Sequence, residues 1–304
     1  MLQAAAGGFS EWPGLLADQV VRQMNKAGKV YLVGAGPGDP ALLTIQALRL
    51  LQTADVVFHD DLVSPEILAL IPSETHVESV GKRCGHASIS QQQIHSLMIN
   101  AAKEGWSVVR LKSGDPLIFG RAGEELDALR GAGIECEIVP GISAAFGAAA
   151  RAGIPLTDRR LASKVLFLSN HQCAGKHLLD WQGAVSEDTT ALIYMPGADY
   201  QGVVAKLCAG GLKPETPCLI VSHATTREQR VHATTLANLA EAPHYPAPVL
   251  LIVGSVAAKY IGEASSVVGS KDSTPSPTFT LDFALIENRL EPREELAETI
   301  QSAK

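Results

Sequence analysis

A regular alternation of short apolar runs with longer amphipathic stretches is the feature that most limits what this chain can fold into. From Lys29 onward, runs rich in β-branched residues, such as VYLVG and SVVRLK, are separated by stretches such as QQQIHSLMINAAKEG, in which apolar residues recur at helical spacing. Strands that alternate with helices form largely parallel sheets covered by helices on both faces. The pattern therefore predicts an α/β fold.

A second series of apolar runs begins near Lys164 and predicts a second α/β domain. It contains KVLFLSNH, TTALIYM, TPCLIVSH and PAPVLLIVG, with helical or turn-forming intervals at residues 202–210 and 235–240. Pro155 and the polar, basic run that follows it separate the two series, so we expect the hinge at residues 155–163. The expected divisions are an N-terminal extension at 1–28, an N-terminal α/β domain at 29–158, a C-terminal α/β domain at 159–262, and a tail with a weak helix at 263–304.

Composition narrows the class of ligand. The 304 residues include 25 Lys and Arg against 32 Asp and Glu, a formal charge of -7, so no general basic surface is available for a nucleic acid. The 5 cysteines are odd in number and form no CxxC pair, which argues against a disulfide framework and a zinc site, and no metal is expected. No apolar run approaches the roughly 20 residues of a membrane span, and we expect a cytoplasmic protein.

The loop GAGPGDP, residues 34–40, follows the first apolar run and invites comparison with a dinucleotide-binding turn. Its glycines are spaced GxGxG instead of GxGxxG, Pro37 removes a backbone donor, and Pro40 holds Asp39 away from helical angles. We expect the next helix to begin only at Thr44. The loop is therefore better suited to a ligand without phosphate. An NAD-binding oxidoreductase stays open as an alternative, because Asp60 could hold a ribose.

Four longer motifs accompany this loop: DVVFHDDLVS (55–64), VGKRCG (80–85), VVRLKSGDPLIFGRAGEE (108–125) and VPGISAAFGAAARAGIPLTDRR (139–160). Together with GAGPGDPALLT they resemble, in order and spacing, the tetrapyrrole methyltransferase family, and within it the enzymes that act on uroporphyrinogen III. The resemblance covers roughly residues 29–256. It implies two α/β domains with an active-site cleft between them, a homodimer, and S-adenosylmethionine as the methyl donor, with S-adenosylhomocysteine as its product.

The reaction that the resemblance implies is transfer of two methyl groups to carbons 2 and 7 of uroporphyrinogen III. Its product would be precorrin-2, the precursor of siroheme and cobalamin. The substrate carries eight carboxylates, so a protein with net negative charge needs clustered arginines to bind it. The basic residues are concentrated in the motifs: Lys82, Arg83, Arg110, Lys112, Arg121, Arg159 and Arg160. Of these, Lys112 is interpreted as structural.

The resemblance also assigns roles to single residues. The expected cofactor contacts are Pro37, Ser113, Gly114, Asp115, Ile118, Ser143, Ala144, Met195 and Ala224. The expected catalytic residues are Asp60 as proton acceptor, Lys82 as proton donor, and Arg121 as a clamp on a carboxylate or on the transition state. Arginine is a poor base at its ordinary pKa, which is why Arg121 is interpreted as a clamp. The expected substrate contacts are Arg83, Glu124, Arg159 and Arg160.

This chain departs from the family's usual pattern at five positions in these motifs: Ser113, Ala122, Arg151, Asp158 and Asn170. Side chains at Ser113 and Ala122 can be accommodated if their φ angles are not positive. Asp158 places a negative charge near a carboxylate-rich substrate unless Arg159 or Arg160 neutralises it. Two alternatives within the resemblance follow from these changes: a methyltransferase for a later precorrin, and a tetrapyrrole carrier without activity.

Overall fold

The structure is a computed structural model that describes residues 28–81, 89–171, 181 and 183–258. All of these residues belong to one compact unit. The predicted N-terminal extension as far as residue 27, the predicted tail, and the site residues Lys82 and Arg83 lie outside the described residues. Within the described ranges, no helix is long and apolar enough to cross a membrane.

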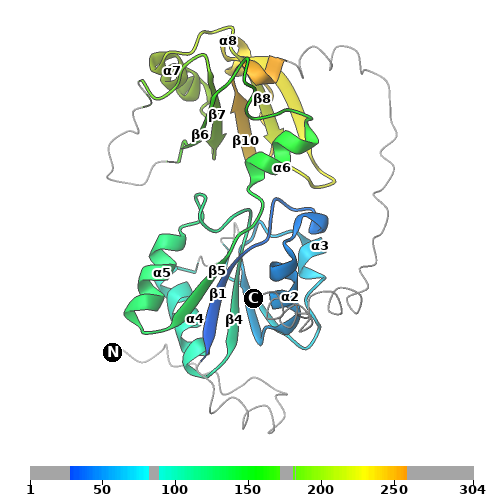
Figure 1. Ribbon diagram of the computed structural model, residues 1–304, viewed down its shortest axis with the longest axis vertical. Helices are drawn as coiled ribbons and strands as arrows, with labels where there is room; N and C mark the ends of the chain where they lie inside the picture. Colours follow the sequence, from blue (N-terminus) through cyan, green and yellow to red (C-terminus); the bar gives the residue numbers. More distant parts are fainter. Residues whose placement is uncertain (1–27, 82–88, 172–180, 182, 259–304) are drawn as a thin grey trace, which may run out of the picture. The chain divides into compact units, whose positions relative to one another are not determined.

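The first sheet consists of five parallel strands in the order β3-β2-β4-β1-β5. The strands are β1 (Lys29–Gly34), β2 (Val56–His59), β3 (His76–Ser79), β4 (Ser107–Lys112) and β5 (Glu135–Val139). Helices α2 and α3 cover one face of this sheet, and α4 and α5 cover the other (Figure 1). Their bounds are α2 (Ile45–Thr53), α3 (Pro65–Leu68), α4 (Gln91–Lys103) and α5 (Ala122–Gly131), and a short 3-10 helix, η2 (Pro40–Leu42), precedes α2.

The alternation of side chains along β4 explains an unusual property of this sheet. Val108 packs with α4 and α5, whereas Val109 and Leu111 pack with α2 and α3. By the same alternation Arg110 and Lys112 face α4 and α5, and each is only 2% exposed. The central strand of the sheet therefore delivers two cations into the interior.

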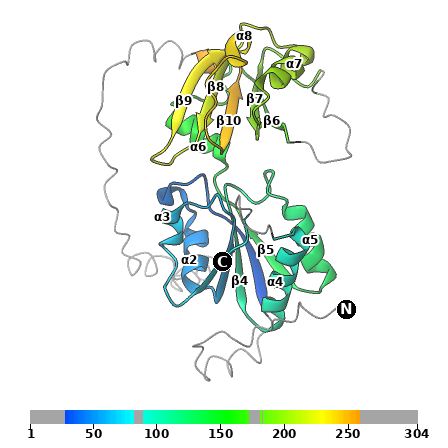
Figure 2. The same cartoon turned by 180° about the vertical axis from the view of Figure 1, so that it is seen from behind.

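The second sheet also has five strands, in the order β6-β7-β10-β8-β9. They are β6 (Lys164–Ser169), β7 (Thr189–Tyr194), β8 (Pro217–Ser222), β9 (Arg230–Thr235) and β10 (Val249–Val253). Only β6 and β7 pair in parallel; the other pairs are antiparallel. Helices α7 (Tyr200–Gly210) and α8 (Leu236–Leu239) pack on one face, and α6 (Ala144–Arg151), which follows β5 in the chain, packs on the other (Figure 2). A 3-10 helix, η3 (Ser255–Ala257), follows β10.

The predicted α/β fold class is confirmed, and so is the parallel sheet with helices on both faces. Two strands were not predicted, β3 and β9. Each lies at the edge of its sheet and is only partly buried, so its sequence (HVES, RVHATT) carries no apolar run. The cysteines in the described ranges, Cys136, Cys208 and Cys218, are free thiols. The division into two domains, and the cleft between them, stay predictions.

Candidate active site

The GAGPGDP loop after β1 is joined by backbone hydrogen bonds to the loop after β4. The Gly36 N–H donates to the Gly114 carbonyl at 3.1 Å, and the Gly114 N–H donates to the Gly36 carbonyl at 2.8 Å. Both glycines have a positive φ, +73° and +69°, which explains why no side chain stands there. Asp39 is extended, and Thr44 caps α2, as the sequence predicted. The first turn of α2 therefore lies beyond the glycines.

The loop after β5 packs against the same two loops. The Gly141 N–H donates to Asp115 Oδ2 at 3.0 Å, and Asp115 Oδ1 accepts from the Leu117 N–H at 2.8 Å. A Cβ on Gly34 would lie 2.5 Å from Gly141 Cα and 2.7 Å from the Gly114 carbonyl oxygen. Three loops from three neighbouring strands thus meet backbone to backbone, without room for a further methyl group between them.

The start of α6 is tied to β7 by a tyrosine. The Tyr194 hydroxyl shares a hydrogen bond with Ser143 Oγ at 2.6 Å and accepts from the Ala145 N–H at 3.1 Å. Burial raises the pKa of Tyr194, so its hydroxyl keeps its proton across the neutral range. The next residue, Met195, has a φ of +49° and is 45% exposed. An exposed apolar side chain on a left-handed backbone is available to contact a ligand.

The loop after β8 completes this group. Thr225 Oγ1 accepts from the Asp39 N–H at 3.2 Å, and Ala224, beside it, is buried. Pro37 packs against α6 here, because a Cβ on Gly147 would lie 2.7 Å from Pro37 Cγ and 2.8 Å from Thr225 Cγ2. The loop after β1 is therefore held on one side by the first sheet and on the other by α6 and β8.

We define the loop cluster as the loops after β1, β5, β7 and β8, residues 113–118 after β4, the strand ends Gly34 and Tyr194, and the first turn of α6. It contains every predicted cofactor contact: Pro37, Ser113, Gly114, Asp115, Ile118, Ser143, Ala144, Met195 and Ala224. A Cβ on Gly114 would meet no atom nearer than 3.8 Å, so there is room for a ligand beside the Gly36–Gly114 bridge. Asp115 is the single charged side chain in the set. An amino-acid nucleoside that carries positive charge and no phosphate, such as S-adenosylmethionine, fits this donor set.

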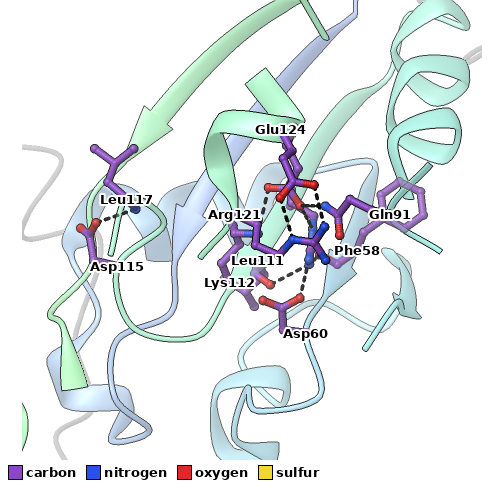
Figure 3. Close-up of polar contacts among 11 residues, drawn as sticks. Phe58, Asp60, Gln91, Leu111, Lys112, Asp115, Leu117, Arg121 and Glu124 are labelled. Carbon is purple, nitrogen blue, oxygen red and sulfur yellow. Dashed lines mark hydrogen bonds and ion pairs between the residues drawn. The ribbon is translucent and has the colours of Figure 1, made fainter. Parts of the chain in front are cut away.

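A pocket of about 210 Å³ opens at the carboxyl ends of β2 and β4. It is lined by Asp60, Val80, Gly81, Ile89, Gln91, Ile94, Arg110, Lys112, Phe119, Gly120 and Arg121. Figure 3 shows how Asp60, Gln91, Lys112 and Arg121, which come from different elements, gather around one spot. We call it the charged pocket. It contains two of the three predicted catalytic residues, Asp60 and Arg121.

Buried ion pairs form the wall of the charged pocket. Arg110 donates through Nε to Glu125 Oε1 at 3.0 Å and through Nη2 to Asp60 Oδ1, and its Nη1 donates to the carbonyls of Phe58 and Leu111. Lys112 Nζ lies 2.8 Å from Glu125 Oε2. Burial lowers the pKa of Lys112, and the charge of Arg110 lowers it further, whereas Glu125 and Asp60 oppose both effects. Asp60, the predicted proton acceptor, is thus paired with Arg110, which the sequence did not indicate.

Arg121 reaches the pocket from an unusual turn. Phe119 and Arg121 have φ angles of +53° and +56°, a left-handed backbone that costs non-glycine residues about 1 kcal/mol or more each. The Arg121 guanidinium binds both oxygens of Glu124, at 2.8 and 2.6 Å. This hydrogen bonding lowers the pKa of Glu124. A strained turn that presents an arginine beside a pocket is typical of a functional site.

Phe119 links the two parts of the site. Its ring lines the charged pocket and lies 5.1 Å, centroid to centroid, from the ring of Tyr194 in the loop cluster. A ligand in the loop cluster would therefore be close to one that enters the pocket.

The residues at which the chain departs from the family pattern are accommodated locally. Arg160 binds Asp158 through Nε and Nη2, at 3.0 and 2.8 Å, so of the two arginines that could neutralise Asp158 it is Arg160 that pairs with it. Arg151, on α6, pairs with Asp39 at 2.9 Å and so contacts the loop after β1. Asn170 donates to the Pro196 carbonyl and accepts from Lys206 Nζ. Ser113 and Ala122 do not have positive φ angles, so their side chains cause no strain.

Some predicted residues are not brought into the charged pocket. Arg159 is exposed on the segment before β6, next to Arg160, and does not line the pocket. Lys82 and Arg83 lie outside the described residues. In the part of the chain that the structure describes, no group of three or more histidine, cysteine or acidic side chains is placed to hold a metal ion.

Sequence reasoning missed three residues that organise the site: Glu125, Tyr194 and Thr225. A signal existed for Glu125, because two cations two positions apart on one strand face the same side and need a buried acid. Lys112 was interpreted as structural, which is incomplete, since it is buried and also lines the pocket. For Tyr194 and Thr225 no signal existed, because their partners lie on the other sheet's loops.

Comparison with known proteins places the chain in a family. A family model described as Tetrapyrrole (Corrin/Porphyrin) Methylases matches residues 29–240. The chain is 49% identical over 247 residues to the uroporphyrinogen-III C-methyltransferase of Paracoccus denitrificans. The aligned residues make up 80% of this chain and 86% of that protein. It is also 49% identical over 232 residues to the siroheme synthase of Nitrosospira multiformis, covering 75% of this chain and 49% of that protein. The chain thus spans about half the length of that relative.

A solved structure agrees with these relatives. The crystal structure of uroporphyrin-III C-methyl transferase from Thermus thermophilus, complexed with S-adenyl homocysteine, matches with a TM-score of 0.67 and 37% identity. The match covers 76% of this chain and 100% of that chain. The loop cluster, the charged pocket and these comparisons lead to one conclusion: the chain belongs to the tetrapyrrole methylases.

Proposed function

We propose that this protein transfers methyl groups from S-adenosylmethionine to carbons 2 and 7 of uroporphyrinogen III, giving precorrin-2 and S-adenosylhomocysteine. The observation that carries the proposal is the contact between Phe119 of the charged pocket and Tyr194 of the loop cluster. It brings a pocket suited to a carboxylate-bearing substrate next to loops suited to a ligand without phosphate. The reaction needs both ligands side by side.

Bound S-adenosylmethionine supplies an electrophilic methyl group on a sulfonium. The electron pair of a pyrrole carbon forms the new carbon–carbon bond, and the carbon–sulfur electron pair leaves with sulfur. The protein therefore needs no covalent nucleophile, and its task is to align the reactants and exclude water. The rigid backbone turns of the loop cluster suit this task, because the paired Gly36 and Gly114 leave little freedom for the loops.

Each methylation ends with loss of a proton from the tetrapyrrole. We assign its acceptance to Asp60, which lines the charged pocket and is partly exposed there. Arg110 binds Oδ1 of this carboxylate, so Asp60 has one oxygen anchored and the other available to the pocket. The role of proton donor is proposed for Lys82 on the family pattern alone.

The size of the charged pocket limits what it can hold. Its volume of about 210 Å³ is below the roughly 300 to 1,000 Å³ of pockets that enclose a whole drug-sized ligand. We therefore propose that it takes one carboxylate-bearing side chain of the substrate, with Arg121 as the clamp, and that the macrocycle lies outside. Glu124 holds the Arg121 fork in place until the substrate carboxylate arrives. Arg83, Arg159 and Arg160 are proposed contacts for the other carboxylates.

The finer features implied by the family are proposals too. We propose a cytoplasmic homodimer, in which each chain has an N-terminal domain at residues 29–158, a C-terminal domain at 159–262 and an active-site cleft between them. Light scattering on the purified protein should report twice the mass of one chain. The mass of a single chain would contradict the dimer without affecting the proposed reaction.

The function is tested by incubating the purified protein with uroporphyrinogen III and S-adenosylmethionine under anaerobic conditions. Mass spectrometry should detect a product with two added methyl groups, together with S-adenosylhomocysteine. No methylated product would contradict the proposal, and later precorrins would then be tried as acceptors. Calorimetry should show binding of S-adenosylhomocysteine and none of NAD. Binding of NAD alone would favour the oxidoreductase alternative, although Arg110 already occupies Asp60, the residue that alternative would use for the ribose.

A further inference from the structure

Glu125 lies below the charged pocket without lining it. It is in the first turn of α5, and its side chain is 0% exposed. Its Oε1 accepts from Arg110 Nε at 3.0 Å and from Gln91 Nε2 at 3.3 Å, and its Oε2 lies 2.8 Å from Lys112 Nζ. Three residues that line the pocket are thus held by one carboxylate from beneath.

Stability does not explain this arrangement well. The side chains of Arg110 and Lys112 are each 3% exposed, and burying a cation is unfavourable unless it is paired. In other proteins, replacing a buried ion pair with well-packed apolar residues is often neutral or stabilising. The next positions of β4 toward its start, Val108 and Val109, are apolar and buried. Arg110 and Lys112 therefore occupy the part of β4 that lines the pocket.

Glu125 also connects the pocket wall to the turn that carries Arg121. The helix that begins with Ala122 follows Arg121 directly, and the Glu125 contacts fix its first turn against β4. Through Arg110 the same carboxylate is linked to Asp60. Both residues proposed to meet the substrate are therefore located relative to Glu125.

We propose that Glu125 is a positioning residue, which keeps Arg110 and Lys112 charged and fixed in the pocket wall and, through Arg110, fixes the Asp60 carboxylate. This rests on the proposed function and adds to it. Glu125 touches neither substrate nor cofactor; it acts through the side chains that do. Lys112 is then a charged element of the pocket wall as well as a buried residue.

The charges around Lys112 determine the pH at which this side chain loses its proton, and this pH can be measured. Asp60, in the loop after β2, and Glu125, on α5, favour its protonated form, whereas Arg110 on the same strand disfavours it. At the rim, Glu124 interacts electrostatically with Lys112, and also with His95 of α4 and with Arg121. Glu125 is the partner in direct contact with the ammonium group. Loss of its charge should let Lys112 lose its proton at lower pH.

The test is Glu125→Gln, which keeps the shape of the side chain and removes its charge. We expect kcat for methylation to fall on the order of a hundredfold, the loss associated with small displacements of catalytic groups. We also expect the alkaline limb of the pH profile to move to lower pH, which a residue with a purely structural role would not cause. The Kd for S-adenosylhomocysteine should stay within about threefold of wild type.

Two further variants separate charge from packing. Glu125→Asp keeps the charge on a shorter side chain. The alkaline limb of its pH profile should therefore lie at the wild-type pH, even if kcat stays reduced. Asp127→Asn is the matched control, because Asp127 lies on the same helix in a surface pair with Arg130, with both side chains more than three-quarters exposed. It should leave kcat and the pH profile unchanged.

The proposal is overturned if Glu125→Gln keeps the wild-type kcat and pH profile. It is also overturned if the alkaline limb of the pH profile lies at the same pH in Glu125→Asp and Glu125→Gln. If Glu125→Gln does not bind S-adenosylhomocysteine and so is not folded, Lys112→Met decides. This variant leaves Glu125 paired with Arg110 and should lose the alkaline limb, and a wild-type profile would overturn the proposal.

Failure of the proposed reaction would be recognised separately. In that case the wild-type protein adds no methyl group to uroporphyrinogen III. The positioning role is then measured through binding of uroporphyrin III, followed by its fluorescence. Glu125→Gln should weaken that binding at least about tenfold at alkaline pH while Asp127→Asn does not, and equal binding by both variants would overturn the proposal.

Discussion

The loop cluster and the charged pocket meet at the carboxyl end of β4, yet they are built by opposite means. The loop cluster is held by backbone contacts between glycines, such as the bridge between Gly36 and Gly114, and by neutral hydroxyls. The pocket wall is made of charged side chains, two of them cations on the central strand. One strand, β4, ends in both, because Lys112 lines the pocket and Gly114 is in the loop cluster.

This difference reflects the two ligands. The same cofactor binds in each turnover, so it can be recognised by its shape. Rigid backbone turns are preorganised to fit that shape and need few charged side chains. A substrate with many carboxylates must be met by cations, and buried cations need buried carboxylates to hold them. Changes in one region should therefore affect one ligand and spare the other.

The largest effect is expected from Arg121→Ala, which removes the proposed clamp from the charged pocket. Methylation should fall by about a hundredfold to a thousandfold, the usual loss when one stabilising donor is removed from an active site. Initial rates of methyl transfer measure it. Arg130→Ala, which breaks a surface pair with Asp127 on the same helix, is the control and should keep the wild-type rate. An equally active Arg121→Ala variant would remove Arg121 from the site.

The next effect is expected in the loop cluster, from Gly34→Ala. The added methyl group would lie 2.5 Å from Gly141 Cα, so the three loops could not keep their spacing. Overpacking of this kind costs about 1 to 3 kcal/mol, and affinity for S-adenosylhomocysteine should fall about tenfold or more. Calorimetry measures it. Gly131→Ala, where an added Cβ meets nothing within 4 Å, should bind as wild type does; similar losses in both variants would show that the spacing of the loops is not the cause.

A smaller effect is expected from Tyr194→Phe, which keeps the ring beside Phe119 and removes the hydroxyl that joins β7 to α6. Two hydrogen bonds are lost, to Ser143 Oγ and from the Ala145 N–H, at roughly 1 kcal/mol each. Denaturant unfolding should show a free energy of unfolding lower by about 1 to 2 kcal/mol. The affinity for the cofactor should fall severalfold. An unchanged midpoint of unfolding would mean that this hydroxyl does not join the two elements.

The smallest effect is expected from Arg151→Ala. Arg151 contacts the loop after β1 through Asp39, but its side chain is 48% exposed and that of Asp39 is 24% exposed. Exposed ion pairs contribute about 0.5 kcal/mol, so the Kd for S-adenosylhomocysteine should rise no more than about twofold. A loss of tenfold would mean that the surface charge of α6, and not only backbone shape, determines cofactor binding.

The sequence predicted the loop cluster better than the charged pocket. The spacing of the glycines, Pro37 and Thr44 has direct consequences for backbone angles, and the resulting turn follows from local rules. The pocket depends on which side chains meet across the sheet. Asp60 was expected as a proton acceptor, but its pairing with Arg110, 50 residues further along the chain, was not indicated by the sequence. Such pairings depend on strand order, which local patterns do not determine.

The fold shows the same contrast. Strands with apolar runs were predicted in both sheets, whereas the edge strands β3 and β9 were missed because their exposed side chains leave no apolar pattern. The antiparallel pairing of most of the second sheet was also not evident, since β8 and β10 are apolar runs much like those of a parallel sheet.

The central claim is that the two regions bind different ligands, and the double variant Asp60→Asn/Arg121→Ala tests it most directly. Calorimetric titration with S-adenosylhomocysteine should give a Kd within about threefold of wild type, because neither side chain belongs to the loop cluster. A Kd raised more than about tenfold, in a variant that unfolds at the wild-type temperature, would contradict the separation of cofactor and substrate sites.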